Sequence, residues 1–346
     1  MAGITYLKEF QKPALRGLVD ALENEKLNAP SLGDRFLPND QIFSTTFAYD
    51  VIKKSNHIAA MIGYGAEPPV VDRDAVAHKM GELAKMGLKY IATEEELLAL
   101  NQARSNAEKN AMVEKLVMKG ADLVQALQRR VDVAKMEAIA KGEFSYNKNG
   151  VKISLDYGIP ADQKIALTSG DDWSNVDRDI IGDLLAWNDL YMNANGKQAD
   201  AILLTREVQA LLLKNTVIVN EARGAQSGAN RVSVNELNTV LGGYGLPPVQ
   251  VITNRQITVK DIYTGEDEVI EFYPKNRVVF VSEGLGNFVY GPTVENEYQP
   301  GIVLQAYDKF EPIQSILRVA AAGFPIVEAP SLLLHADVFT EAGAEG

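Results

Sequence analysis

The chain has 346 residues, of which 46% are hydrophobic, enough to fill the core of one large domain or two ordinary ones. Its 34 basic and 46 acidic side chains give a formal net charge of -12, which argues against a dedicated nucleic-acid-binding protein but leaves a local basic patch open. The absence of cysteine excludes disulfides and thiolate metal sites, and we expect a soluble protein because no signal peptide or apolar membrane span can be found.

The N-terminal part predicts elements that reach outward. Residues 5–40 place prolines and a glycine between short apolar pairs, which favours an extended arm with one short helix near 14–27 and little core of its own. Residues 42–49 and 57–64 then have strand-like patterns, and glycines and prolines close the second run. We therefore predict a long hairpin that projects from the body.

A long helix dominates the middle of the chain. Thr93 precedes three glutamates, which predicts a capped helix start. This explains the three acids more simply than a metal site would. From Asn106 to Gly142 apolar residues recur at intervals of three, four and seven without a proline, which predicts a helix on the order of 50 Å long. Gly120 inside it indicates a close-packing point or a weak spot. The helix also carries basic side chains, for which a solvated face is the default and contact with a neighbour's acids or with DNA an alternative: Arg129, Arg130, Lys135 and Lys141.

The chain beyond the helix predicts a hairpin over 144–155 and, from a boundary near Asp171, a second lobe in which helices alternate with strands. We expect Ser174 with Asp177 to cap a helix that ends at Asn195-Gly196. The remaining predictions are a buried strand at 201–204, helix caps at Thr205 and Ser233, a mobile loop at 221–230, and strands at 249–252, 268–272 and 277–281.

Signals for chemistry are weak throughout. The three histidines, His57, His78 and His335, do not have metal-ligand spacing, and neither a hydrolase elbow nor a phosphate-binding loop occurs. The run Gly284-Leu285-Gly286 is more simply a turn between strands than a dinucleotide site. We therefore expect no catalytic residue, no cofactor-binding residue, no metal site and no cofactor.

The paired acids and the two tryptophans at the start of the second lobe are expected to have structural roles. The paired acids Asp171 and Asp172 directly precede a predicted helix, where carboxylates offset the helix dipole, and nothing places them in a cleft for acid-base chemistry. Trp173 and Trp187 are expected to be anchors of a core or of an interface.

The order of these elements resembles the major capsid proteins of tailed double-stranded DNA bacteriophages, specifically the capsid protein E family, which is related to the lambda coat protein and has the HK97-type fold. The matching stretches are Asp172-Trp173-Ser174, Glu221-Ala222-Arg223-Gly224, Tyr273-Pro274-Lys275-Asn276, Arg318-Val319-Ala320, and Pro330 to Asp337. Each motif is short, and their order along nearly the whole chain makes the resemblance specific.

The resemblance implies an α+β fold divided into five segments. These are an N-terminal arm at 1–40, an E-loop hairpin with its flanking segment at 41–92, a peripheral domain with the long spine helix at 93–170, an α/β axial domain at 171–305, and a return to the peripheral domain at 306–346. It implies a structural protein, not an enzyme, that forms pentamers and hexamers in an icosahedral shell around DNA. We therefore expect a virion protein that is assembled in the host cytoplasm and binds no membrane.

The partners implied are other copies of the chain, a portal and possibly a decoration protein. Because the arm begins almost at Met1, we also expect a separate scaffolding protein, and we expect no covalent crosslinking and no sequence-specific contact with DNA. Two alternatives stay open. One is a bacterial nanocompartment (encapsulin-like) shell protein, and the other is a cytoplasmic α/β enzyme built on the lobe after Asp171.

Overall fold

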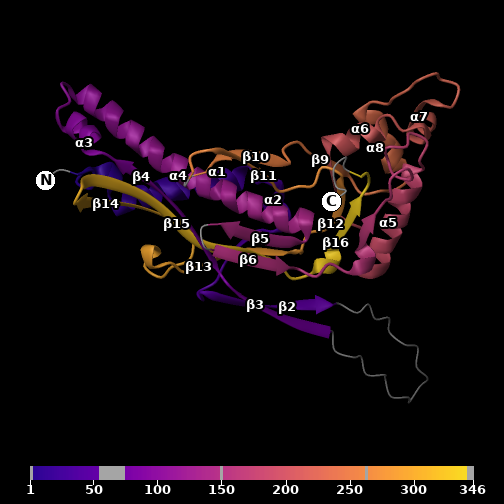
Figure 1. Cartoon of the computed structure of the whole chain (residues 1–346), viewed down its shortest axis with the longest axis horizontal. Coiled ribbons are helices and arrows are strands. Elements are labelled where there is room, and N and C mark those ends of the chain that lie inside the picture. The colour runs from indigo at the N-terminus through magenta and orange to yellow at the C-terminus, as the bar shows by residue number, and fades with distance from the viewer. Residues whose placement is uncertain (1–2, 54–74, 149–150, 262–263, 341–346) are drawn as a thin grey trace, which may run out of the picture. The chain divides into compact units, whose positions relative to one another are not determined.

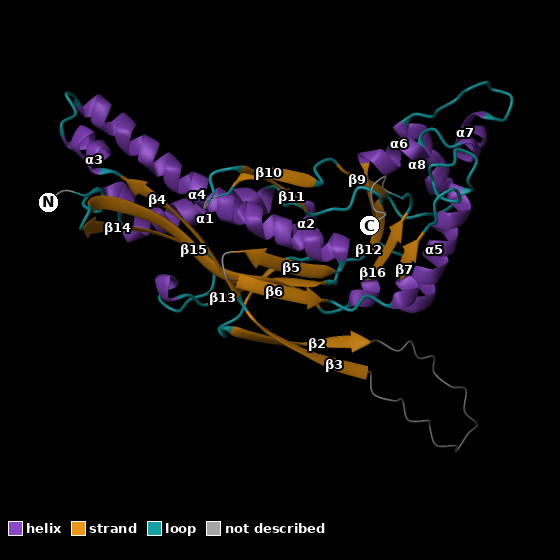
Figure 2. Ribbon diagram, in the orientation of Figure 1, coloured by secondary structure: helices purple, strands orange, loops and turns teal. Residues whose placement is uncertain are grey.

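A computed structural model of the chain describes residues 3–53, 75–148, 151–261 and 264–340 (Figures 1 and 2). The chain forms two compact units. The first unit comprises Met1–Tyr49, Lys79–Lys135 and Asn287–Ile326, and the second comprises Asp50–His78, Met136–Gly286 and Val327–Gly346. Each unit is therefore built from segments that are distant in the sequence. The predicted boundaries of the five segments stay predictions.

The first unit combines helices with a five-stranded sheet. Its elements are η1 (Lys8–Phe10), α1 (Lys12–Asn28), α2 (Leu32–Phe36), β1 (Asn39–Gln41), β4 (Ala84–Ala92), α3 (Glu94–Asn101), most of α4 (Asn106–Lys141), β13 (Gly286–Gly291), η3 (Val294–Asn296), β14 (Val303–Phe310) and β15 (Ile313–Val327). The sheet has the order β1-β13-β15-β14, and β4 also pairs with β15. The long strand β15 runs antiparallel to both β14 and β4 and so holds the sheet together.

The N-terminal segment is not extended where it is described. Pro13 lies in the first turn of α1, where its missing N–H costs nothing, and Ser31 forms a capping box that begins α2. Ile4, Phe10 and Leu15 are each at most 3% exposed. The short helix predicted near 14–27 is confirmed as α1, whereas the expectation of an extended arm needs correction, because these side chains are part of the core of the first unit.

The long helix is confirmed as α4. It runs from Asn106 to Lys141 and ends at Gly142, whose φ of +69° suits glycine. Gly120 is a close-packing point, because a Cβ atom there would lie 3.2 Å from Cδ2 of Leu304 in β14. The capping box at Thr93 is confirmed at the start of α3.

The projecting hairpin can be followed only at its base. Strands β2 (Thr46–Lys53) and β3 (Ala75–Glu82) form a two-stranded sheet. The first predicted strand, 42–49, therefore begins and ends later in the chain. The second, 57–64, lies outside the described residues, as does His57. His78 lies in β3 and not near a helix.

The second unit contains a mixed sheet with the order β7-β16-β12-β8-β9. Its elements are β5 (Glu143–Lys148), β6 (Val151–Asp156), η2 (Ala161–Gln163), β7 (Lys164–Ala166), α5 (Ile180–Asn195), β8 (Ala201–Thr205), α6 (Arg206–Leu212), α7 (Thr216–Arg223), α8 (Val234–Gly243), β9 (Val249–Ile252), β10 (Gln256–Lys260), β11 (Asp267–Glu271), β12 (Arg277–Val281), η4 (Pro330–Leu332) and β16 (Leu333–Asp337). The central strands β8 and β12 are buried and pair antiparallel.

Most predicted elements of this unit are confirmed, and two need correction. The hairpin is β5–β6, and Thr205 and Ser233 cap α6 and α8. Helix α5, however, is capped by Asp179 and not by Ser174 with Asp177, because the side chain of Asp179 accepts the N–H of Gly182. The segment predicted as a loop over 221–230 begins inside α7, and its mobility stays a prediction. Among the described residues, no helix combines the length and apolar character needed to cross a membrane.

Candidate functional site

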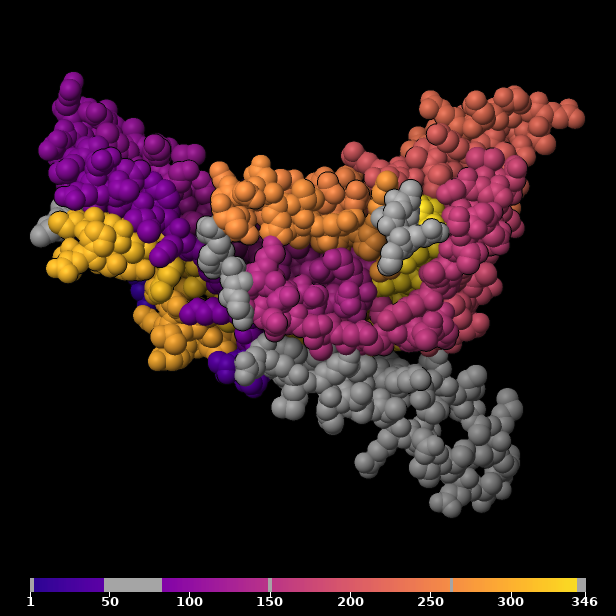
Figure 3. Space-filling view, viewed as in Figure 1, coloured from indigo at the N-terminus to yellow at the C-terminus, as the bar shows by residue number. Residues whose placement is uncertain are grey.

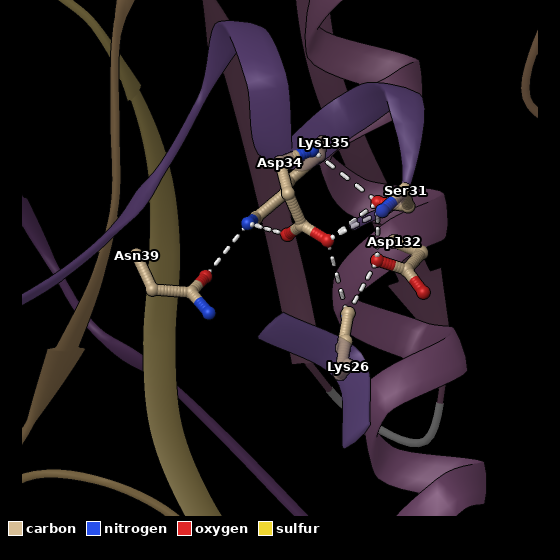
Figure 4. Close-up of polar contacts among 6 residues, drawn as sticks. All are labelled: Lys26, Ser31, Asp34, Asn39, Asp132 and Lys135. Atoms are coloured by element: carbon tan, nitrogen blue, oxygen red, sulfur yellow. Dashed lines mark hydrogen bonds and ion pairs between the residues drawn. The ribbon is translucent and has the colours of Figure 1, made fainter. Parts of the chain in front are cut away.

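A cluster of four charged and two uncharged polar side chains lies inside the first unit, between the N-terminal helices and α4 (Figure 4). Its six members are Lys26 of α1, Ser31 and Asp34 around α2, Asn39 of β1, and Asp132 and Lys135 of α4. Nζ of Lys135 donates to Oδ1 of Asp34 at 2.5 Å and to Oδ1 of Asn39 at 2.6 Å. The ammonium of Lys135 is thus shared between the start of α2 and β1.

A second ion pair completes the cluster. Nζ of Lys26 lies 2.6 Å from Oδ1 of Asp132 and 3.8 Å from Oδ2 of Asp34. The hydroxyl of Ser31 donates to Asp34 at 2.8 Å and contacts Asp132 at 3.1 Å. Two ammonium groups therefore face two carboxylates, and the cluster is formally neutral.

Burial makes this cluster important for stability. The side chain of Lys135 is 0% exposed and that of Asp34 is 13% exposed. Burial lowers the pKa of Lys135, although the bond to Asp34 acts in the opposite direction. For Asp34 burial acts to raise the pKa, but the hydrogen bond and charge of Lys135 outweigh it, and the pKa of the carboxyl is lowered. Through this pair Lys135 of α4 holds α2, and through Asn39 it holds β1.

The sequence contained a signal for this cluster. Lys135 follows Val131, which is fully buried, by one helical turn, and so lies on the apolar stripe of α4. Ser31-Leu32-Gly33-Asp34 has the spacing of a capping box. The interpretation of Lys135 as part of a solvated face is wrong, because α1 and α2 cover that stretch of the helix. Lys141, in contrast, is partly exposed and pairs with Glu137.

The last histidine, His335, is buried in the middle of β16. Nε2 of His335 lies 2.8 Å from the carbonyl oxygen of Ile139, and burial together with the nearby charge of Arg277 lowers its pKa to about 3. Next to it Arg277 forms a double ion pair with Asp337, at 2.7 and 2.8 Å, and donates to the carbonyl of Ala140. The C-terminal strand is therefore held against the end of α4 by polar groups.

The motif Asp172-Trp173-Ser174 is also structural. The rings of Trp173 and Trp187 stack at 5.5 Å in the core of the second unit, as the anchor prediction required. Nε1 of Trp173 donates to Asp183, which also receives two bonds from Arg178. Asp172 accepts the backbone N–H groups of Ser174 and Thr340. The acids before α5 thus organise a turn and do not meet in a cleft.

Two hollows lie on the surface of the described residues. A hollow of about 260 Å³ in the first unit is lined by apolar residues such as Leu97, Leu98, Phe310 and Ile313. A wider one of about 490 Å³ in the second unit has mixed lining that includes Phe339. Within the described parts of the chain, no group of three or more His, Asp or Glu side chains is placed to hold a metal ion. Neither hollow gathers a set of side chains for a recognised reaction.

Comparison with known proteins gives a consistent result. The model of a protein family described as "Phage major capsid protein E" matches residues 14–338. A solved structure of a putative capsid protein of a prophage from Escherichia coli CFT073 is similar with a TM-score of 0.62 and 12% identity, covering 95% of this chain and 99% of that chain. A phage-related protein from Bordetella bronchiseptica RB50 has a TM-score of 0.54 and 12% identity, covering 95% of this chain and 98% of that chain. No curated protein matches the sequence.

The structural likeness confirms the predicted α+β fold of the HK97 type. The family match extends over nearly the whole sequence, from α1 to the residue after β16. These findings confirm the resemblance inferred from the order of the elements. The chain therefore belongs to the phage major capsid protein E family, whose members are structural proteins of the phage shell.

Proposed function

We propose that this chain is the repeating subunit of an icosahedral shell, assembled from pentamers and hexamers, that encloses double-stranded DNA. The observation that supports this proposal is the family match over residues 14–338. The role is that of a building block, so its chemistry consists of association between copies. Its place in the virion follows from the same family, and we propose that assembly takes place in the host cytoplasm.

The surface of the first unit supports association. Leu98, Phe310 and Ile313 line one hollow and are 50%, 70% and 40% exposed. Tyr6, which is 45% exposed, donates to Asn101, another residue that lines this hollow. Large apolar side chains gathered in this way are unfavourable in water and are typical of surfaces that become buried on association. We therefore propose that copies of the chain cover this end of the first unit.

The enclosed DNA needs no specific site in this account. With a net charge of -12 the protein as a whole repels phosphate, so DNA can enter and leave the shell without being held by it. We further propose a separate scaffolding protein and a portal as partners, with a decoration protein as an optional third. The segment boundaries at 41, 93, 171 and 306 belong to the same proposal.

The two alternatives lack a specific observation in their favour. A nanocompartment shell protein would share the HK97-type fold, but the family that matches is the phage one. An α/β enzyme in the second unit would need convergent polar groups in a cleft. Asp171, Asp172 and His335, its best candidates, are instead engaged with Arg178, with backbone N–H groups and with the carbonyl of Ile139.

The proposed function is tested by the mass of the purified protein in solution. Size-exclusion chromatography with light scattering, over a range of protein and salt concentrations, should show assemblies of five and six subunits or larger closed particles. Negative-stain electron microscopy of the same fractions should show rings or shells. A small discrete oligomer under every condition, alone and with the proteins of neighbouring genes, would contradict the proposal.

A further inference from the structure

The two faces of the sheet in the first unit carry different side chains. Strands β4, β15 and β14 lie side by side in antiparallel register. On one face Leu304, Leu317 and Val319 are at most 4% exposed, and Gly120 of α4 packs against Leu304. On the other face Lys85 and Lys89 of β4 are exposed. Figure 3 shows the β14–β15 hairpin, in yellow, at the surface of the first unit.

The face that carries Lys85 and Lys89 is basic although the protein is acidic. Four of the 34 basic side chains lie on it, namely Lys85, Lys89, Lys309 and Arg318. Among the described residues, Glu295 is the one acidic side chain that contacts them: it lies 2.6 Å from Lys85 and 3.6 Å from Nη1 of Arg318. We call this set of four basic residues the basic face. Its positive charge is only partly compensated within the unit.

The strand register makes this arrangement unfavourable in a free subunit. Lys89 lies directly opposite Arg318, and two like charges opposite each other destabilise a sheet. Lys89 forms no ion pair with any described residue, and Glu295 is already shared between Lys85 and Arg318. A carboxylate supplied from outside the subunit would relieve the repulsion between Lys89 and Arg318.

The residues beside these charges favour a protein partner over DNA. Ile91 and Tyr307, each 37% exposed, flank the buried Ile316 on the same face. The guanidinium of Arg318 lies over the ring of Tyr307, 5.5 Å from its centroid. Arginine and aromatic residues are enriched in protein interfaces. Contacts to a nucleic-acid backbone, in contrast, go to phosphates and gain nothing from Ile91.

We propose that the basic face binds a carboxylate-bearing surface of a second copy of this chain. The inference rests on the proposed shell function, because it needs copies that associate. A second copy fits the charge, since the chain has 46 acidic side chains against 34 basic ones. Complementary charges at the edge of an interface set the register of the partners and accelerate their encounter more than they add affinity.

The test compares two charge reversals of equal size in the full-length chain. Lys89→Glu places a carboxylate on the basic face, whereas Lys115→Glu makes the same change at an exposed position of α4 that has no partner among the described residues. Because Lys89 is exposed and unpaired, both variants should fold, which far-UV circular dichroism checks. Lys89→Gln is the milder second variant. Assembly is measured by light scattering between 0.05 and 1 M NaCl, which spans Debye lengths of roughly 14 to 3 Å.

We expect Lys89→Glu to raise the protein concentration needed for assembly at least roughly tenfold at low salt, because the new carboxylate would repel the carboxylate that Lys89 faces in the other copy. Lys89→Gln should have a smaller effect in the same direction, and Lys115→Glu should assemble like wild type. A zero-length carbodiimide crosslink in a mixture of ¹⁴N- and ¹⁵N-labelled protein should join Lys89 or Lys85 of one copy to a carboxylate of another.

Three results would overturn the inference, and they are distinguishable. If wild type and Lys89→Glu assemble equally, the basic face is not an interface between copies, while the proposed function stands. If both assemble but Lys89→Glu alone loses binding to a duplex DNA fragment, the face binds nucleic acid instead. If wild type assembles under no condition, the proposed function fails and this inference with it.

Discussion

Replacing Lys135 by methionine removes an ammonium group that is 0% exposed and leaves the carboxylate of Asp34 in place. Removing one partner of a buried ion pair costs roughly 3–5 kcal/mol, because the other charge remains buried. Lys26 lies 3.8 Å from Asp34 and compensates part of this loss, so we expect the free energy of unfolding to fall by about 3 kcal/mol. Asn39 also loses the donor at 2.6 Å.

The assay uses the positions of the tryptophans. Both tryptophans, Trp173 and Trp187, lie in the second unit, whereas the cluster lies in the first. In urea denaturation of unassembled protein, far-UV circular dichroism therefore reports on helices of both units and tryptophan fluorescence reports on the second. We expect Lys135→Met to shift the circular dichroism transition to lower urea and to move the fluorescence transition less.

Two further variants make the test quantitative. Lys119→Met removes an exposed lysine of the same helix, paired only at the surface with Asp122, and should change stability by less than about 0.5 kcal/mol. The double variant Asp34→Asn with Lys135→Met removes both charges and should lose less than the sum of the single changes. If Lys135→Met unfolds at the same urea concentration as Lys119→Met, the cluster does not stabilise the first unit.

The remaining predictions concern pH, the core and the N-terminus. The pKa of His335 is lowered from 6.5 to about 3 in the folded protein, so between these pH values the unfolded chain binds a proton at this residue that the folded chain does not. His335 therefore reduces the free energy of unfolding progressively as pH falls from 6.5 toward 3. In His335→Gln the urea midpoint should depend less on pH over this range. The pKa of Asp34 is lowered from 3.8 in the folded protein, so the carboxylate stabilises the fold at pH values above 3.8, and this stabilisation is lost as pH falls through the pKa of the folded state. Unfolding of Asp34→Asn, followed by circular dichroism, should therefore depend less on pH below about pH 4. Trp173→Ala should cost about 3–5 kcal/mol in urea denaturation, and a loss below 1 kcal/mol would contradict the core position of the stacked pair. Deletion of residues 1–30 removes Ile4, Phe10, Leu15 and Val19 from the core, each worth about 1.5–3 kcal/mol, so the product should be insoluble or unfolded; a soluble, cooperatively folded product would show that this segment is dispensable for the first unit.

Local patterns predicted the parts of the structure that are themselves local. Helix α4 follows from an unbroken apolar period without proline, and the capping boxes at Thr93 and Ser233 follow from short spacings. The hairpin β5–β6 follows from two short strand-like segments joined by residues that include an Asn-Gly pair, which is typical of hairpin turns. In each case the interactions that fix the element lie within a few residues of one another.

Features that depend on distant segments were missed. The burial of Lys135 requires α1 and α2, whose last residues lie about a hundred positions earlier in the chain. Sequence alone gave the N-terminal segment little core, because its buried residues find their partners in the strands near the C-terminus, such as Ser315, which accepts the N–H of Ile4. Ser174 does not cap α5 because the helix begins later in the chain, at Ile180, where Asp179 is the N-cap; the backbone N–H of Ser174 donates to Asp172.

For the basic face, too, the sequence shows which residues are present but not how they are arranged. The basic side chains of β4 and β15 are visible in the sequence, but their positions opposite each other come from the pairing of strands more than two hundred residues apart. The resemblance to a phage capsid family could be inferred because it rests on the order of elements, which does not require knowledge of contacts. The individual residues of the proposed interface could be identified only from the register of β4 against β15.

Electron microscopy of particles is the decisive test of whether copies of this chain build a closed shell. The chain would be produced together with the proteins of its neighbouring genes, and particles would be purified by sedimentation. We expect closed icosahedral particles whose reconstructed subunit has the fold described above. A protein that sediments only as a monomer or small oligomer, with no rings or shells in any preparation, would contradict it.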